Sequence, residues 1–565
     1  MPLQDFTSEP RVAYFSMEIA LRPEIHTYSG GLGILAGDTL RSCADLELNL
    51  VAVSLVSHAG YFLQTIDTEG RQQESIEPWN PAEWATPLDA KITVSIQGRK
   101  VWVGGWLYQL KGHLNGCQPV ILLDTDLNEN QEEDREITHF LYGDDQSYRL
   151  KQEVVLGVGG IRMLQALGFQ ISHHHMNEGH SALLAVELLR RNALPHSDLR
   201  AGESPYNIAQ VREHCSFTTH TPVDAGHDKF PYTLVRDILT DFIDLHIIES
   251  LAGDDVMNMT RLALNLSETI NGVTQRHAEI SRSKFPQYKV RAITNGVHPQ
   301  TWTSQPVAAV FDKYFPGWCH EPESLVRADC CLPDDEIWNA HCEAKRQLLE
   351  RINTATGDEL DPEVFLIGFA RRMTDYKRPD LLFSDVSRLT EIAKKRPFQI
   401  VLAGKAHPKD VGGKALIELL HQYIRELRDN IQITYLPNYA MSTALAMVSG
   451  VDAWLNTPMP PLEASGTSGM KAAFNGVPNL SVLDGWWLEG CIEGVTGWSI
   501  GDTNSGDPVR DANSLYEKLE NTVLPLYYDD RSGWIKVMRG AISKNASFFN
   551  SHRMMRRYVT EAYIR

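Results

Sequence analysis

The most constraining feature of this sequence is a repeated order of apolar strand, loop and amphipathic helix. Residues 169–176 form a strand-like run before a helical pattern over 179–191, and residues 364–370 precede a helical pattern over 379–395. Residues 399–403 lead through Gly404 and Pro408 to a helical pattern near 415–427. This alternation is typical of doubly wound parallel sheets. The sequence therefore predicts an α/β protein whose ligands bind at the carboxyl ends of its strands.

The length and the distribution of prolines predict more than one domain. A chain of 565 residues exceeds what a single small module requires. The stretch between Trp302 and Asp334 contains several prolines and interrupts any long periodicity, so we place the boundary there. Residues 1–302 and 303–540 are then two α/β halves. Residues 541–565 belong to a basic C-terminal segment, which we expect to be a helix that packs back on the N-terminal half.

Composition excludes several classes of protein. Hydrophobic residues make up 43% of the chain and charged residues 22%, as in ordinary globular proteins. The formal net charge of −19 disfavours nucleic acid and anionic membranes as partners. No apolar stretch reaches the ~18 residues of a membrane span, and the first residues do not resemble a secretory signal. We therefore expect a cytoplasmic protein whose eight scattered cysteines are reduced.

The segment 463–471, Glu-Ala-Ser-Gly-Thr-Ser-Gly-Met-Lys, predicts an anion site beside a lysine. Small residues leave backbone N–H groups accessible, and residues 468–474 are predicted to form a short helix that ends at Asn475-Gly476. The N-terminus of such a helix favours an anion. Lys471 would lie about one turn further on, where a lysine that holds a phosphorylated aldehyde would be needed. A turn with a surface lysine is the alternative.

Other segments contain groups that suit phosphate or a polar ligand. Arg372 and Lys377 lie five residues apart after a strand-like run, so they could meet one anion; a solvated basic loop is the alternative. The glycine-rich segment 28–38 would let the main chain approach a phosphate closely. His220 in 217–222 and Asn295 in 293–299 are polar side chains at predicted strand ends.

Two clusters of histidine or cysteine lack the spacing of a zinc site. Neither contains a paired C-x-x-C or an H-E-x-x-H pattern, so we assign them structural roles and predict no metal site. They are His173, His174, His175 and His180 at one strand-to-helix corner, and Cys319, His320, Cys330, Cys331, His341 and Cys342 near the predicted boundary.

Taken together, these segments resemble the α-glucan phosphorylases, the family of the glycogen, starch and maltodextrin phosphorylases, and within it the short bacterial and archaeal type. The resemblance follows the order of the family over most of the chain, and segment 463–471 is its most specific part. It comprises residues 12–18, the glycine-rich segment 28–38, Asn-Glu-Gly-His at 177–180, His220, Asn295, residues 372–377, 404–408, 438–439 and 463–471, and Asp-Gly at 484–485.

The resemblance implies a fold, a reaction and a coenzyme. The fold would be GT-B, two doubly wound Rossmann-like domains facing a cleft. The reaction would be reversible, retaining transfer of a terminal α-1,4-linked glucose to inorganic phosphate, which gives glucose 1-phosphate. Pyridoxal 5'-phosphate would be bound covalently to Lys471 as a Schiff base. The partners would be the glucan and phosphate, without nucleic acid or membrane, and a homo-oligomer is compatible with the family.

The resemblance also assigns roles to individual positions. The catalytic group would be Lys471, Arg372, Lys377, His220 and Glu463, with the substrate phosphate held by Arg372, Lys377 and the backbone of Gly31. Around the coenzyme would lie Lys471, Gly466, Thr467, Lys405, Tyr439 and Trp302. Around the glucose would lie Leu32, His220, Asn295, Glu463, Ser465 and Gly466.

Two other functions compete with this interpretation. A glucosyltransferase of the glycogen synthase kind, which uses a sugar nucleotide, shares the GT-B architecture and a similar glycine loop, but it would not need Lys471. A glucan-binding protein without activity would be expected to lose its catalytic groups. Because Arg372, Lys377, Lys471, His220 and Glu463 are all present, the phosphorylase is the preferred hypothesis.

Overall fold

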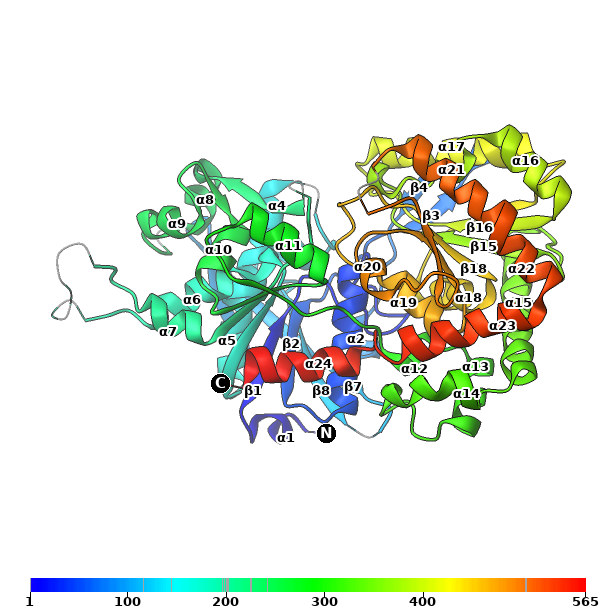
Figure 1. Ribbon diagram of the computed structural model, residues 1–565. Helices are drawn as coiled ribbons and strands as arrows, with labels where there is room; N and C mark the ends of the chain where they lie inside the picture. Colours follow the sequence, from blue (N-terminus) through cyan, green and yellow to red (C-terminus); the bar gives the residue numbers. More distant parts are fainter. Residues whose placement is uncertain are drawn as a thin grey trace.

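A computed structural model describes residues 2–114, 116–143, 145–195, 197, 199, 203–223, 226–240, 242–503 and 506–564. Two large sheets, each covered by helices, form the two halves of the molecule (Figure 1). Among the described residues, no helix has the length and apolar character to cross a membrane.

The first sheet belongs to the N-terminal half. Seven of its strands run parallel in the order β14-β13-β10-β9-β1-β2-β8, and β7 continues the sheet antiparallel to β8. The short strands β5 and β6 pair with β7. The strands are β1 (Arg11–Phe15), β2 (Leu50–Leu55), β5 (Thr86–Pro87), β6 (Ile92–Ile96), β7 (Arg99–Lys111), β8 (Cys117–Asp124), β9 (Ile171–Asn177), β10 (Cys215–Thr218), β13 (Thr269–Gly272) and β14 (Val290–Ala292).

The second sheet contains six strands, and all its pairs are parallel. Their order, β17-β16-β15-β18-β19-β20, corresponds to 3-2-1-4-5-6, the order typical of a doubly wound sheet. Every residue of β15 and β16 is buried, which explains their continuous apolar sequences. The strands are β15 (Phe365–Ala370), β16 (Phe398–Ala403), β17 (Ile433–Leu436), β18 (Ala453–Asn456), β19 (Asn479–Val482) and β20 (Gly497–Ile500).

Helices cover both sheets. In the N-terminal half they are α1 (Leu3–Thr7), α2 (Gly31–Asp45), α3 (Glu132–Arg135), α4 (Gln146–Val154), α5 (Gly160–Ala166), α6 (Leu183–Arg191), α7 (Ile208–Glu213), α8 (Tyr232–Leu239), α9 (Leu245–Ala252), α10 (Met259–Asn265) and α11 (Gln275–Lys284). The rest are α12 (Pro299–Trp302), α13 (Gln305–Tyr314), α14 (Ala328–Cys331), α15 (Asp334–Thr356), α16 (Val386–Lys395), α17 (Val411–Leu427), α18 (Met441–Gly450), α19 (Thr467–Phe474), α20 (Trp487–Gly490), α21 (Pro508–Lys518), α22 (Leu524–Asp529), α23 (Arg531–Gly540) and α24 (Ser551–Tyr558).

The strands expected from the sequence are present, but two helix starts are wrong. The helix expected from residue 379 begins at Val386, because Arg378 has a positive φ of 45° and its buried guanidinium donates to the carbonyls of Thr457 and Pro458. The helix expected near residue 415 begins earlier, at Val411, where the Asp410 side chain caps it.

The proline-containing stretch after Trp302 is not an extended linker. It forms α13, a turn of 3-10 helix and α14. Its large side chains, Phe311, Phe315 and Trp318, are buried in the core of the C-terminal half, so this stretch belongs to that half structurally. Pro306 and Pro322 lie at helix starts, where their missing N–H costs nothing.

Two segments pack against the half of the molecule to which they do not belong in the sequence. The hairpin of β3 (Leu63–Ile66) and β4 (Gln72–Ser75) lies beside β16 and α17 (Figure 1). There Gln64 donates to the Gly404 carbonyl at 2.8 Å and Gln72 to that of Ala406 at 2.9 Å. At the other end of the chain, α24 packs on α2, with Met554, Met555 and Tyr558 in one apolar cluster with the N-terminal sheet. Both crossings hold the two halves together.

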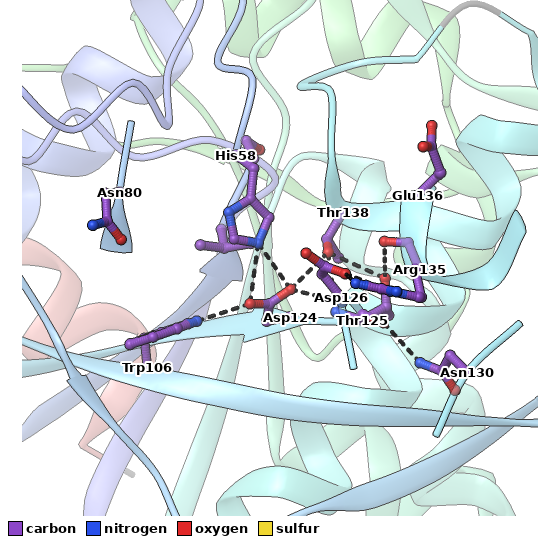
Figure 2. Close-up of polar contacts among 12 residues, drawn as sticks. His58, Asn80, Trp106, Asp124, Thr125, Asp126, Asn130, Arg135, Glu136 and Thr138 are labelled. Atoms are coloured by element: carbon purple, nitrogen blue, oxygen red, sulfur yellow. Dashed lines mark hydrogen bonds and ion pairs between the residues drawn. The ribbon is translucent and has the colours of Figure 1, made fainter. Parts of the chain in front are cut away.

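A buried carboxylate stabilises the loop that leads to this hairpin. Asp124, the last residue of β8, lies 3.1 Å from His58 Nε2 and accepts from Trp106 Nε1 at 2.8 Å (Figure 2). Burial raises the pKa of Asp124, but His58 and the other donors outweigh this and hold it below its usual value. The anchored loop ends at Phe62, whose carbonyl accepts a hydrogen bond from Lys405 across the interface.

Candidate functional site

A cavity of about 650 Å³ lies between the two halves. It is lined by the residues that follow the carboxyl ends of β1 and β9 in the first sheet and of β15 and β18 in the second. These are the neighbouring strands at which each sheet reverses its strand order, the place where open α/β sheets bind ligands. Every residue named for the site from the sequence lines this cavity: Gly31, Leu32, His220, Asn295, Trp302, Arg372, Lys377, Lys405, Tyr439, Glu463, Ser465, Gly466, Thr467 and Lys471.

The loop after β18 leads into α19, which carries Lys471 into the cavity. Gly466 has a φ of +85°, a conformation that side chains rarely adopt, and the helix starts at the next residue. The first turn of α19 lies at the cavity wall, since Thr467 and Ser468 line it, and the first N–H groups of a helix have no partner within the helix. Ser465 Oγ is buried there without a hydrogen-bond partner among the described residues. The short helix predicted from the sequence is thus confirmed.

Lys471 is buried against an aromatic ring rather than against a carboxylate. Its Nζ lies 3.6 Å from the centre of the Trp302 ring, and the Trp302 indole donates to Asp38 Oδ2 at 2.8 Å. Burial lowers the pKa of Lys471 to about 8, although Asp38 acts in the opposite direction. A substantial fraction of the amine is therefore neutral, and so nucleophilic, close to physiological pH.

Lys377 and Arg371 share Glu463. Lys377 Nζ lies 2.5 Å and Arg371 Nη2 2.7 Å from Glu463 Oε2, and all three side chains are mostly buried. Burial raises the pKa of Glu463, but the two cations outweigh this and hold it below its usual value. The Glu463 carboxylate is thus ionised, and the backbone N–H of Glu463 is fixed by Asp484 Oδ2 at 2.8 Å.

Arg372 lies beside the glycine-rich segment and is exposed to the cavity. A Cβ atom placed on Gly30 would lie 3.1 Å from Arg372 Nη2, so the glycine is what allows this close approach. Glu18 fixes the turn before α2, because its carboxylate accepts from the N–H of Ser29 at 2.6 Å and of Gly30 at 3.1 Å. This places the Arg372 guanidinium, which has no ion-pair partner among the described residues, next to the N-terminus of α2.

Lys405 follows β16 and Tyr439 follows β17, and both line the wall of the cavity that the second sheet forms. Lys405 Nζ donates to the Phe62 carbonyl at 2.8 Å. Burial lowers the pKa of Lys405 to about 8. Burial also raises the pKa of the Tyr439 hydroxyl, so this group remains protonated.

The first sheet contributes neutral polar groups. His220 Nε2 lies 2.6 Å from Asn177 Oδ1, and burial lowers the pKa of His220 to about 3, so the imidazole is neutral and donates to this oxygen. Asn295 Oδ1 is buried at the cavity wall without a partner among the described residues. Arg553 from α24 donates to the carbonyls of Thr294 and Asn295 at 2.7 and 2.9 Å, which fixes this loop.

Several polar or charged residues at the cavity had no catalytic or binding role assigned from the sequence. Glu178 is the most informative: its φ is +71°, and its carboxylate accepts from the N–H of His220 at 2.7 Å. Burial raises the pKa of Glu178 to about 7. Glu178, His180 and Glu18 lie in the motifs 177–180 and 12–18, which could have identified them, whereas Arg149 on α4 gave no signal. The residues in question are Glu18, Arg149, Glu178, His180, Asp228 and Arg371.

The histidine and cysteine clusters named from the sequence do not converge in the described structure. His173 bonds to Ser216, and His175 to Thr218 and Tyr563, so these are hydrogen-bonded core residues. In the part of the chain that the structure describes, Asp45, His298 and His552 are the group whose ligand atoms come within metal-binding distance of one another.

Comparisons with known proteins point to one family. A family model described as carbohydrate phosphorylase matches residues 240–493. Maltodextrin phosphorylase of Thermococcus litoralis is 38% identical over 98% of this chain and 70% of its own length. Glycogen phosphorylase of Aquifex aeolicus is 35% identical over 99% of this chain and 86% of its own length. An uncharacterized protein of Methanocaldococcus jannaschii is 31% identical over 98% of this chain and 99% of its own length. The chain therefore belongs to the carbohydrate phosphorylase family.

Proposed function

We propose that this protein is an α-glucan phosphorylase, which transfers a terminal α-1,4-linked glucose to inorganic phosphate and back with retention of configuration. The names of its relatives support this activity. The observation that carries it is the convergence of residues from both sheets on one cavity that also contains Lys471, with a pKa of about 8. A nucleotide-sugar transferase would not require that buried amine.

We further propose the GT-B arrangement and the domain limits 1–302, 303–540 and 541–565. Two doubly wound sheets that face one cavity support the first of these. The apolar clusters support the domain limits. The cluster around β15 to β20 is formed almost entirely by residues after 296, and the C-terminal helix α24 packs on α2 of the N-terminal half.

The cavity fits pyridoxal phosphate. Lys471 supplies an amine of lowered pKa over the Trp302 ring, and the N-terminus of α19 with the unpartnered Ser465 Oγ supplies donors for a phosphate. Gly466, Thr467 and Lys405 would hold that phosphate, and Tyr439 and Trp302 would flank the ring. When bound, the coenzyme supplies a phosphate with a second pKa of about 6, which can exchange a proton with the substrate phosphate near neutral pH.

Arg372 and the main chain at Gly31 hold the substrate phosphate. Two unit negative charges about 5 Å apart repel by about 3 kcal/mol at an effective dielectric constant of 20, so a site for two phosphates needs cations. Among the described residues Arg372 makes no ion pair, whereas Lys377 and Arg371 are bound to Glu463. Lys377 therefore contributes its charge to the phosphate site while it also fixes Glu463.

Neutral and acidic groups bind the glucose. His220, Asn295 and Leu32 lie on the wall formed by the first sheet, and Glu463, Ser465 and Gly466 lie on the opposite wall. The neutral imidazole of His220 and the carboxylate of Glu463 pair with sugar hydroxyls, which are both donors and acceptors. This arrangement needs no pair of carboxylates of the kind that hydrolases use.

Replacement of Arg372 by lysine tests the phosphate site. Lysine keeps the charge but loses the planar fork, so we expect the KM for phosphate to rise about tenfold, equivalent to the loss of one charged hydrogen bond. The KM for glucan should stay within about twofold and serves as the internal control. An unchanged phosphate KM would contradict this role of Arg372.

The lowered pKa of Lys471 predicts how covalent uptake of pyridoxal phosphate by the coenzyme-free protein depends on pH. The neutral amine is the reactive form, so the uptake rate should rise with pH through about 8 and then level off. The uptake is followed by absorbance at saturating coenzyme. A rate that continues to rise to pH 10, as expected for a lysine of ordinary pKa, would exclude a desolvated Lys471 as the attachment site.

The activity itself is tested by offering a maltodextrin with either phosphate or a sugar nucleotide. We expect glucose 1-phosphate from the first mixture and no chain extension from the second. Extension that requires the sugar nucleotide would favour the transferase, and binding of the glucan without either reaction would favour a non-catalytic protein.

A further inference from the structure

Outside the cavity, three buried side chains converge from distant parts of the sequence. Asp45 is the last residue of α2, His298 precedes α12, and His552 lies in the first turn of α24. The potential ligand atoms of all three lie within 4.8 Å of one another. All three residues are at most 3% exposed.

The two histidines present the same ring atom to the same carboxylate oxygen. His298 Nε2 lies 2.8 Å from Asp45 Oδ2, and His552 Nε2 lies 3.7 Å from it. The His552 Nε2 atom is buried and has no hydrogen-bond partner among the described residues. A polar atom that is fully buried and unpartnered is costly and calls for a partner that is not a protein group.

The surroundings of the three side chains support them as ligands. His298 Nδ1 lies 2.8 Å from Thr301 Oγ1, and His552 Nδ1 lies 3.3 Å from Ser42 Oγ. The second oxygen of Asp45, Oδ1, accepts from the N–H of His113 at 2.5 Å. Such outer hydrogen bonds orient the ligands of metal sites and direct the other ring nitrogen toward the ion.

We propose that Asp45, His298 and His552 bind one divalent transition-metal ion, with zinc the best match. Two imidazoles and one carboxylate are borderline ligands that suit zinc. Bond lengths of about 2.0–2.1 Å in a tetrahedral site separate neighbouring ligand atoms by about 3.3 Å. The observed separations of 2.8 and 3.7 Å bracket this value, so small movements of the side chains create the site. One tetrahedral position remains for water.

Binding changes the tautomer of one histidine. Without the ion, the N–H of Thr301 donates to His298 Nδ1, so the proton is on Nε2 and is donated to Asp45. With the ion, the proton moves to Nδ1 and is donated to Thr301 Oγ1, the N–H of Thr301 gives up its bond to Nδ1, and Nε2 binds the metal as a neutral imidazole. The number of protons on the three ligands does not change.

The ion would act as a clip between segments that build the cavity. Helix α2 begins at Gly31, and α12 ends at Trp302, the residue under Lys471. Helix α24 carries Arg553, which holds the loop of Asn295. The ion would lie outside the cavity, where it would stabilise the packing of these three helices without contact with the substrate.

The proposal is tested on the full-length protein after dialysis against a chelator. Zn²⁺ is titrated and the bound ion is measured, and Co²⁺ is used in parallel because its visible absorption reports tetrahedral nitrogen and oxygen ligands. We compare wild type with His552→Gln, which removes a ligand that has no hydrogen-bond partner among the described residues, and with His320→Gln, an exposed histidine nearby, as the matched control.

We expect one Zn²⁺ per chain in wild type and in His320→Gln, a tetrahedral Co²⁺ spectrum, and a higher melting temperature with Zn²⁺ than with chelator. In His552→Gln the affinity should fall at least about 100-fold. If wild type binds no stoichiometric Zn²⁺ and gives no tetrahedral Co²⁺ spectrum, the proposal is wrong whatever the variants do. Zinc binding that His552→Gln leaves unchanged would also overturn it.

Discussion

Replacement of Lys471 by alanine is expected to reduce phosphorolysis to the background rate while the protein stays folded. The amine is the proposed attachment point for the coenzyme, and among the described residues that line the cavity it is the cation that lies over the Trp302 ring. The variant leaves no carboxylate unpaired, because Lys471 packs against a ring. Activity is measured as glucose 1-phosphate released from maltodextrin, and folding as circular dichroism and the melting temperature.

The control for this variant is Lys536→Ala, which removes an exposed lysine on α23 and should leave activity and stability unchanged. Near wild-type phosphorolysis by Lys471→Ala would contradict the assignment of Lys471. Loss of cooperative unfolding in that variant would show that Lys471 is needed for the fold rather than for the reaction.

Replacement of Glu463 by glutamine is expected to affect stability and activity together. It leaves Arg371 and Lys377 buried without their shared carboxylate, a change that typically costs about 3–5 kcal/mol in the free energy of unfolding. Turnover should fall about 10²- to 10³-fold through the loss of a preorganised charge. Inorganic phosphate should bind at least as tightly as in wild type, since both cations become available to it.

The matched control is Glu391→Gln on the surface of α16, where the ion pair with Lys394 is solvated and should contribute nothing measurable. Two results would count against the role of Glu463: turnover close to that of wild type, or phosphate binding that is lost together with turnover. The second result would mean that Glu463 organises the whole pocket rather than the glucose side of it.

Much of the site could be predicted because its residues lie in short motifs at strand ends. The small residues of 463–471 and the apolar run before Arg372 indicate their local structures directly, and both fold as expected. The ion pair of Lys377 with Glu463 could not be predicted in the same way, because it joins residues 86 positions apart in the sequence. Arg149 gave no signal either, since it lies on an ordinary amphipathic helix and reaches the cavity only through the packing of α4.

Other features depend on tertiary structure alone. The prolines after Trp302 indicated a domain boundary, but they could not show that Phe311 and Trp318 pack into the second core. Asp45, His298 and His552 come from three segments, so no local spacing could reveal them. In the same way, the positive φ of Arg378 delays α16 because the buried guanidinium is held by the loop after β18.

The most direct test of the account is to locate the coenzyme on the chain. The active protein is treated with borohydride to fix any covalently bound pyridoxal phosphate, digested and analysed by mass spectrometry, while phosphate-dependent release of glucose 1-phosphate is measured on the same preparation. The account predicts one label per chain, on Lys471, in a protein whose activity requires phosphate. A label on Lys405, or phosphate-dependent activity in a protein without any label, would contradict it.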